Sequence, residues 1–367
     1  MLSRHAKQHG NVAAKCSGRG CCEHQPRSCE RHCSVAAHHP VPCLAALEAT
    51  CRGGVGWCVQ RGGQCVPECI PASLPPAAFQ QRLRHALLTR SPIVDRAQEA
   101  AVSLVFYRGG TPRPVQKQGK AVQSYHVLAH SLLFHLRAEQ TVAPTSRVWL
   151  EFGVAAGFSL NATCRAISQR GFSDTWRVHG FDTFEGLPEA WTEGLPKGFA
   201  PMEKGHFSQG GRLPRVAQPC GVLHKGLINA TLPRVLEGFH RVASLGSSSP
   251  LEVASRSRAR GATRVAGMSI DVDLYTGTVQ ALQHGFPLLR PQALLHFHEL
   301  GHSECCQFGC PAARTCWPPG KQQEEARALH DYLRKERPNA LLALLPTTGP
   351  PGQPEQAAAL VVVRTGS

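Results

Sequence analysis

The sequence predicts an α/β fold with a doubly wound, mostly parallel sheet and helices on both faces. From residue 147 onward, short apolar segments alternate with amphipathic ones, as strands and crossover helices do in a parallel sheet. The first apolar segment runs into a turn with two glycines, a strand–turn–helix pattern typical of nucleotide-binding α/β folds. The last two apolar segments are too close for a crossover helix, so they predict a terminal hairpin with one antiparallel strand.

Each expected strand is a short run of mostly apolar residues bounded by polar or turn residues. The expected strands cover residues 148–152, 177–181, 222–225, 267–270, 293–297, 341–345 and 358–363. The intervening helices are expected over 160–169, around 232–239, before Pro287, and over 322–335. Proline lacks the N–H that a helix interior needs, so Pro287 should end the third of these helices.

The chain divides into three expected parts. Residues 1–70 hold ten of the sixteen cysteines and little apolar periodicity. Such a segment is either cross-linked, metal-held or a poorly ordered Cys-rich extension, and we adopt the last interpretation. Residues 71–146 read as a proline-rich linker and two helices, which would cover one sheet face or line a substrate entrance. Residues 147–367 form the α/β domain.

Charge and hydropathy exclude some classes of function. The net charge is +15, but the basic residues are scattered, so we expect no specific nucleic-acid partner. No window approaches 18 apolar residues, so we expect no membrane span. The first ten residues lack an apolar core, which argues against a cleavable secretory signal, and the absence of acidic residues before Glu23 is compatible with an organelle transit peptide. We therefore expect a soluble protein that is cytoplasmic or organellar.

Polar residues follow the expected strands at the points where each strand ends. In an open α/β sheet the carboxyl ends of the strands meet in one crevice, where ligands bind. These residues are Glu151, Asp182, Asp271, Asp273, His298 and Glu299.

Two of these carboxylates, Asp271 and Asp273, lie two residues apart. In an extended segment both would face the crevice, so that one could bind a metal while the other acts as a base. His298 and Glu299 could complete an oxygen and nitrogen ligand set for a divalent cation, or they could simply cap their strand. An Asp-x-Asp pair also occurs in sugar-nucleotide glycosyltransferases.

Four segments between residues 147 and 300 resemble a known family. They read Glu151-Phe-Gly-Val-x-x-Gly-x-Ser159, Gly180-Phe-Asp-Thr-Phe-Glu-Gly-Leu-Pro-Glu189, Lys225-Gly-x-x-x-x-Thr-Leu-Pro233 and Ser269-Ile-Asp-Val-Asp-Leu-Tyr275. Together they resemble macrocin O-methyltransferase-type (TylF-like) enzymes, which are class I S-adenosylmethionine-dependent methyltransferases. The cysteine-rich residues 1–70 and the insertion with Cys305 and Cys316 have no counterpart in this resemblance.

The resemblance implies a role for each matching residue. The methionine part of the cofactor would be surrounded by Glu151, Gly153, Gly157 and Ser159. Asp182 would hold the ribose, with Thr183 and Phe184 beside the adenosine. Asp271 would ligate magnesium, and Asp273 would be the general base. The family usually has Asp-Asp or Asp-Glu where this chain has His298-Glu299, and a histidine ligand would favour a transition metal over magnesium.

The sequence therefore predicts a metal-assisted O-methyltransferase that acts on a sugar-like hydroxyl of a small molecule. One alternative is a methyltransferase-like binding module without turnover, and another is an Asp-x-Asp glycosyltransferase. Two segments, Asn161-Ala-Thr163 and Asn229-Ala-Thr231, match the glycosylation sequon, and we interpret both as coincidental matches.

Overall fold

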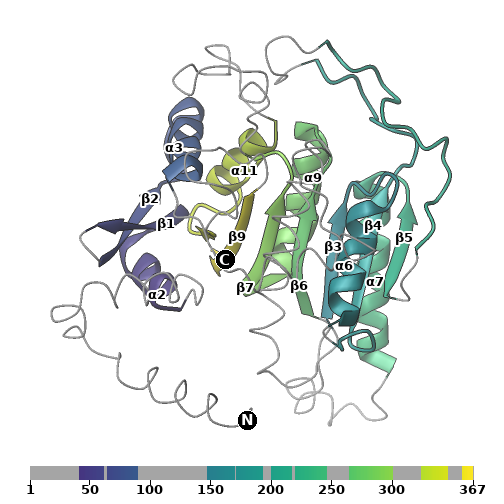
Figure 1. Ribbon diagram of the computed structural model, residues 1–367, viewed down its shortest axis with the longest axis horizontal. Coiled ribbons are helices and arrows are strands. Elements are labelled where there is room, and N and C mark those ends of the chain that lie inside the picture. The colour runs from purple at the N-terminus through teal and green to yellow at the C-terminus, as the bar shows by residue number, and fades with distance from the viewer. Residues whose placement is uncertain are drawn as a thin grey trace, which may run out of the picture.

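The computed structural model describes residues 41–61, 64–89, 147–169, 171–192, 200–216, 220–245, 264–300, 324–345 and 358–366. The strands are β1 (Gly54–Arg61), β2 (Gln64–Ile70), β3 (Arg147–Phe152), β4 (Trp176–Asp182), β5 (Gly221–Lys225), β6 (Arg264–Ile270), β7 (Leu289–Phe297), β8 (Leu341–Leu344) and β9 (Ala358–Arg364). In this part of the chain they form a nine-stranded sheet with the order β2-β1-β8-β9-β7-β6-β3-β4-β5 (Figure 1). This is the mixed, mostly parallel sheet that the sequence predicts.

Strand β3 lies inside the sheet, two strands away from the β5 edge, and its residues are all buried. It runs parallel to β4 on one side and to β6 on the other, with Glu151 opposite Gly180 and Ser269. The chain passes from β3 to β4 and β5 in one direction and to β6 and β7 in the other. The order of strands thus reverses beside β3, which is where doubly wound folds bind their ligands.

Strand β9 lies between β7 and β8 and runs antiparallel to both, and β2 runs antiparallel to β1 at the edge of the sheet. The expected terminal hairpin is therefore confirmed. The short link between β8 and β9 leaves no room for the crossover that a parallel pair needs.

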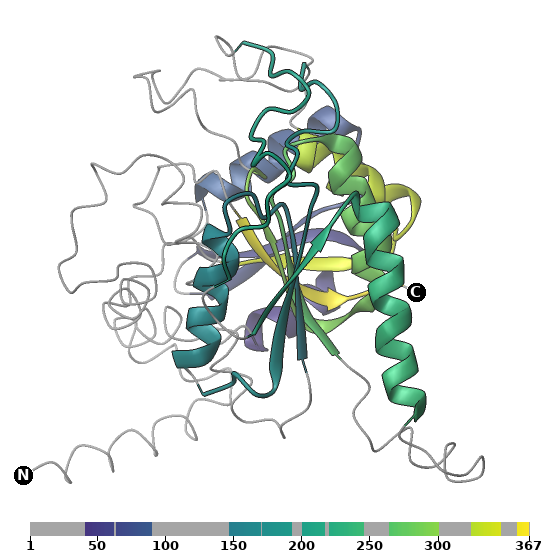
Figure 2. The same ribbon diagram turned by 90° about the vertical axis from the view of Figure 1, so that its right-hand side faces the viewer.

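Helices cover both faces of the sheet. They are α2 (Val41–Thr50), α3 (Pro76–Thr89), α6 (Phe158–Gln169), α7 (Ile228–Leu245), α9 (Tyr275–Gly285), the short 3-10 helix η3 (Phe286–Leu288) and α11 (Glu324–Lys335). Figure 2 shows α6 on one face, whereas α7, α9 and α11 lie on the other. The buried residues separate accordingly: Leu160 and Ile167 of α6 belong to one apolar core, whereas Leu282 and Leu329 join α3 and α7 in a second.

The expected apolar stripes are buried. Phe79, Leu83 and Leu87 of α3 have almost no exposed surface, and Leu329 and Leu333 of α11 have none. Helix α9 ends at Gly285 and η3 contains Pro287, which confirms the expected stop. The second of the two helices expected within residues 71–146, over residues 121–139, lies outside the described residues. Residues 246–263 also lie outside them.

Residues 41–70 differ from the sequence expectation. They form α2, β1 and β2 rather than a poorly ordered extension, and residues 1–40 lie outside the described part. Gly54–Gly56 pair in parallel with residues 341–343 of β8, and a disulfide joins Cys51 to Cys69. The large apolar side chains Val55 and Trp57 are both buried and lie two residues apart. This spacing is typical of a strand and not of a helix. The sheet domain therefore includes residues 54–70. No described helix is both long and apolar enough to span a membrane.

Candidate functional site

The glycine turn after β3 requires glycine at two positions. Gly153 has φ +83°, and a Cβ there would lie 1.7 Å from the carbonyl oxygen of Asp271. Gly157 has φ +81°, and a Cβ there would lie 3.1 Å from the Cβ of Pro214. Residues that carry a side chain rarely adopt such backbone conformations, so replacing either glycine by another residue is unfavourable. The turn thus brings the ends of β3 and β6 against each other.

Glu151 is buried beneath this turn with only 1% of its surface exposed. Its Oε1 accepts a hydrogen bond from Ser159 Oγ at 2.6 Å, so the structure brings these two predicted site residues together. Its Oε2 has no hydrogen-bond partner among the described residues. Burial raises the pKa of Glu151 to about 8, against the opposing effect of the Ser159 hydrogen bond. An oxygen that is buried without a partner is costly, so this carboxyl is suited to a cationic ligand.

Asp182 ends β4, as the sequence predicts, but its hydrogen bonds were not predicted. Its Oδ2 accepts hydrogen bonds from the N–H groups of Val154 (2.8 Å) and Ala155 (2.7 Å), and its Oδ1 accepts one from Phe184 (2.6 Å). A carboxylate offers about four acceptor positions, of which two fasten the glycine turn to the end of β4 and a third holds the turn after β4. The side chain therefore shapes the loop in which a ligand would lie.

Thr183 and Phe184 belong to the turn after β4. Thr183 Oγ1 donates to the carbonyl oxygen of Gly186 at 3.0 Å and accepts from the N–H of Glu185 at 3.2 Å. The Phe184 side chain is buried. These two residues thus stabilise the loop from within.

Within three residues of the ends of β3, β4 and β6, three residues other than glycine have a positive φ. They are Ala155 (+45°), Phe184 (+57°) and Asp273 (+60°). Such conformations cost about 1–3 kcal/mol each and concentrate at functional sites. All three lie at the edge of the sheet that carries Glu151 and Asp182, which identifies this edge as the candidate site.

The segment with Asp271 and Asp273 is not extended, which corrects the sequence expectation. The N–H of Leu274 donates to the carbonyl oxygen of Val272 at 2.6 Å, so the chain turns tightly at Asp273. The expectation that both carboxylates face the same side rested on an extended backbone. Because the chain turns here, that argument does not apply to Asp273. The direction of the Asp273 side chain depends instead on the positive φ of its backbone.

The residues expected to bind a metal do not form a metal site. His298 Nδ1 lies 3.0 Å from Asp271 Oδ1, so two of the expected ligands are paired with each other. Burial lowers the pKa of His298, but Asp271 outweighs it and raises the pKa to about 9. Over the described residues, no group of three or more His, Cys, Asp or Glu side chains is arranged to hold a metal ion. The donor set therefore does not fit the expected divalent cation.

Helix α11 contributes two carboxylates that the sequence analysis missed. Glu325 Oε2 accepts a hydrogen bond from the N–H of Glu299 at 2.8 Å, and Glu324 Oε2 accepts one from the N–H of Tyr275 at 2.9 Å. Burial and the nearby Asp271 raise the pKa of Glu325 well above its ordinary value. The only sequence signal was a pair of acidic residues at a helix start, which ordinarily reflects the helix dipole.

Apolar residues from the connection after β4 pack against Leu274, the residue that follows Asp273. Leu187 and Trp191 pack with Leu274 in a small buried cluster, against which Met202 packs. The Thr276 hydroxyl donates to Glu189 Oε1, which ties this connection to the first turn of α9. The residue next to Asp273 is therefore packed against apolar and aromatic side chains.

The solved structures that this chain resembles have low sequence identity to it. The calicheamicin methyltransferase CalS11 is 20% identical, covers 79% of this chain and 93% of its own, and has a TM-score of 0.39. The O-methyltransferase NovP is 12% identical, covers 79% and 100%, and has a TM-score of 0.39. An O-methyltransferase from Bacillus cereus in complex with SAH is 14% identical, covers 78% and 97%, and has a TM-score of 0.31.

These similarities are too distant to carry an argument about the site. No family model matches the chain. No curated protein matches it either. The account of the site therefore depends on the geometry of this chain.

Proposed function

We propose that the protein is an S-adenosylmethionine-dependent methyltransferase that methylates a hydroxyl group of a small, sugar-like molecule. The observation that supports this most is Glu151, which is buried under the glycine turn with one oxygen lacking a hydrogen-bond partner among the described residues. S-adenosylmethionine carries an ammonium and a sulfonium group, and a cation beside Glu151 would stabilise its ionised form. When bound, the cofactor supplies an electrophilic methyl group.

The remaining cofactor contacts follow from the loops around Glu151. Gly153 and Gly157 have positive φ values, which favour glycine. Because glycine has no side chain, a ligand could approach the backbone of the turn closely. Ser159 holds Glu151 in place by its hydrogen bond. Asp182 holds the N–H groups of the turn, and its remaining acceptor position is where the ribose would bind. Thr183 and Phe184 would border the adenosine.

Asp273 is the residue we propose as the base that takes the proton of the acceptor hydroxyl. Its backbone is held at φ +60° by the turn between Val272 and Leu274, which fixes where the carboxylate starts. Asp271 is paired with His298 at 3.0 Å, and the charge of Asp273 also acts on His298. A base that is held in place contributes about 10²–10⁴ to a rate.

The acceptor would lie between Asp273 and the wall formed by Leu187, Trp191 and Met202. An aromatic and apolar wall beside a carboxylate suits a sugar ring, whose C–H face packs on apolar surface while its hydroxyls need acceptors. The Asp-x-Asp glycosyltransferase alternative needs both aspartates around a metal ion. The pairing of Asp271 with His298 and the turn at Asp273 do not favour it.

Two measurements test the proposal. Calorimetry with S-adenosylhomocysteine and, separately, with uridine diphosphate glucose decides between the cofactors. Incubation with methyl-labelled S-adenosylmethionine and a panel of glycosides and nucleotide sugars then tests for transfer of label to a hydroxyl. Binding of the nucleotide sugar instead of S-adenosylhomocysteine would contradict the proposal. Binding of S-adenosylhomocysteine without label transfer to any acceptor would favour a module without turnover.

A further inference from the structure

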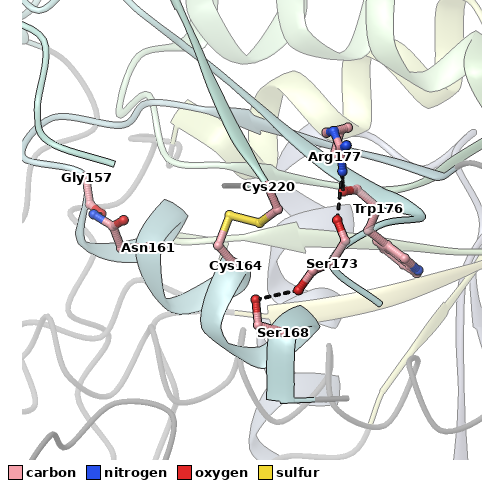
Figure 3. Close-up of a disulfide and its surroundings, with 8 residues drawn as sticks. All are labelled: Gly157, Asn161, Cys164, Ser168, Ser173, Trp176, Arg177 and Cys220. Atoms are coloured by element: carbon pink, nitrogen blue, oxygen red, sulfur yellow. Dashed lines mark hydrogen bonds between the residues drawn. A yellow bond between two sulfur atoms is a disulfide. The ribbon is translucent and has the colours of Figure 1, made fainter. Parts of the chain in front are cut away.

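Disulfides stabilise the described part of the chain, and two of them join described residues at both ends. Cys164 on α6 is bonded to Cys220, which directly precedes β5, and both residues are fully buried (Figure 3). The second disulfide, between Cys51 and Cys69, fastens α2 to β2. Disulfides of this structural kind form and persist in oxidising compartments and are rare in the cytosol.

Formation of each disulfide has a defined chemistry. The two thiols lose two protons and two electrons, a sulfur–sulfur bond forms, and a disulfide of an oxidative-folding protein is reduced to a dithiol. The chain itself does not supply the oxidant. The two disulfides therefore point to maturation where such a protein is present, as in the lumen of the secretory pathway.

The two glycosylation sequons differ in their surroundings. Asn161 lies in the first turn of α6, and its Nδ2 donates to the carbonyl oxygens of Gly157 (2.8 Å) and Arg215 (3.2 Å). Its amide is therefore used to fasten the glycine turn to the segment around Arg215. Asn229 lies in the first turn of α7 and is exposed. A bulky modification fits at Asn229 and conflicts with the packing at Asn161.

We propose that the protein matures in an oxidising secretory lumen and that Asn229 carries an N-linked glycan there. In this reaction a bond forms between Asn229 Nδ2 and C1 of the first sugar of a lipid-diphosphate-linked oligosaccharide. The bond from C1 to the phosphate oxygen breaks, the lipid diphosphate leaves, and the amide nitrogen loses a proton. This reverses, for Asn229 alone, the interpretation of the sequon as a coincidental match, and it departs from the expected cytoplasmic or organellar location.

The position of Asn229 leaves the candidate site accessible. Helix α7 follows β5, and β5 is the last strand of the described sheet, separated from β3 by β4 (Figure 1). The start of α7 therefore follows the carboxyl end of β5, two strands away from β3. Glu151 and Asp273 lie at the ends of β3 and β6, nearer the centre.

The test uses the full-length chain, purified from the cells that make it and alkylated without reductant. Peptides released after amide-cleaving glycosidase treatment in ¹⁸O-water should show labelled aspartate at position 229, unlabelled Asn161, and Cys164 linked to Cys220. Unmodified Asn229, or free alkylated Cys164 and Cys220, would overturn the proposal. Label at position 161 in place of 229 would overturn it as well.

A matched pair of variants provides a second readout in the same cells. Thr231→Ala removes the hydroxyl residue of the sequon, whereas Thr231→Ser keeps it and can keep the hydrogen bond that Thr231 Oγ1 donates to Leu227 at 2.9 Å. The glycosidase should shift the mobility of the wild-type protein and of Thr231→Ser but not of Thr231→Ala. Equal mobility shifts for both variants would contradict glycosylation at Asn229.

Discussion

Glu151 and Ser159 face each other across the glycine turn, with Ser159 Oγ 2.6 Å from Glu151 Oε1. The hydrogen bond satisfies one oxygen of a buried carboxyl and leaves the other, Oε2, without a partner in the described structure. A protonated carboxyl can remain in such a place, whereas an ionised one needs a cation. This relationship leads directly to the first prediction.

The stability of the ligand-free protein should fall as pH rises from about 4.5 to about 8. Between the ordinary pKa of 4.5 and the raised pKa of about 8, the folded protein binds more protons at Glu151 than the unfolded chain does. The full effect is on the order of 5 kcal/mol at most. Urea unfolding of the wild-type protein and of Glu151→Gln across this range measures it. The difference between the two proteins should change with pH, and a constant difference would contradict the raised pKa.

The histidine pair between β4 and β5 predicts the opposite pH dependence. His179 Nδ1 lies 2.9 Å from His224 Nε2, and burial, together with the neighbouring His224, lowers the pKa of His179 to about 4. The unfolded chain therefore binds more protons than the folded one between pH 6.5 and 4, so stability should fall as pH falls through this window.

Replacement of His179 by Gln should remove most of this acid sensitivity, at most about 3 kcal/mol. Replacement of His206, an exposed residue, by Gln is the control and should leave the sensitivity unchanged. The measurement is again urea unfolding, performed between pH 4 and 7. Acid sensitivity that persists unchanged in His179→Gln would mean that other groups cause it.

Asp182→Ala should destabilise the protein even without a ligand. The variant leaves the N–H groups of Val154, Ala155 and Phe184 without their carboxylate acceptor. A hydrogen bond to a charged acceptor is worth about 1.5–3 kcal/mol, so we expect a loss of that order in the free energy of unfolding. Cofactor binding should weaken as well because the turn loosens. If the ligand-free stability were unchanged while binding was lost, Asp182 would act through the ribose alone.

Asp273→Asn should abolish methyl transfer and leave cofactor affinity nearly intact. Asparagine tolerates the positive φ of this turn and keeps the shape of aspartate, but its amide cannot take the proton. We expect the single-turnover rate to fall by about 10²–10⁴ once an acceptor is known. Asp271→Asn is the matched comparison. It makes the same chemical change two residues before Asp273 and removes the charged partner of His298. A full rate in Asp273→Asn with loss in Asp271→Asn would exchange the two roles.

The sequence predicts the strands, helices and strand ends because these depend on local periodicity. Glu151 and Ser159 lie within eight residues of each other, and a strand–turn–helix pattern is enough to bring them together. Contacts between distant residues have no such local signal. The hydrogen bonds of Asp182 to the glycine turn and the approach of Glu325 to Glu299 depend on how separate elements pack.

Backbone geometry also limits what the sequence can predict. The positive φ of Asp273 is not encoded by a glycine, so the Asp-x-Asp segment reads as extended when it is in fact turned. The strands β1 and β2 were missed because their cysteines dominate the composition and conceal a short alternating pattern. Asp271, His298 and Glu299 at the ends of neighbouring strands were interpreted as metal ligands. In the structure, His298 and Asp271 are paired with each other.

The central claim is that Glu151 and the glycine turn bind S-adenosylmethionine, and calorimetric titration of the full-length protein with S-adenosylhomocysteine tests it most directly. We expect micromolar-scale binding by the wild-type protein and about tenfold to hundredfold weaker binding by Glu151→Gln, which cannot form the charge-assisted contact. Ser159→Ala, which loses only the hydrogen bond that holds Glu151, should weaken binding less. No binding by the wild-type protein, or equal binding by Glu151→Gln, would contradict the account.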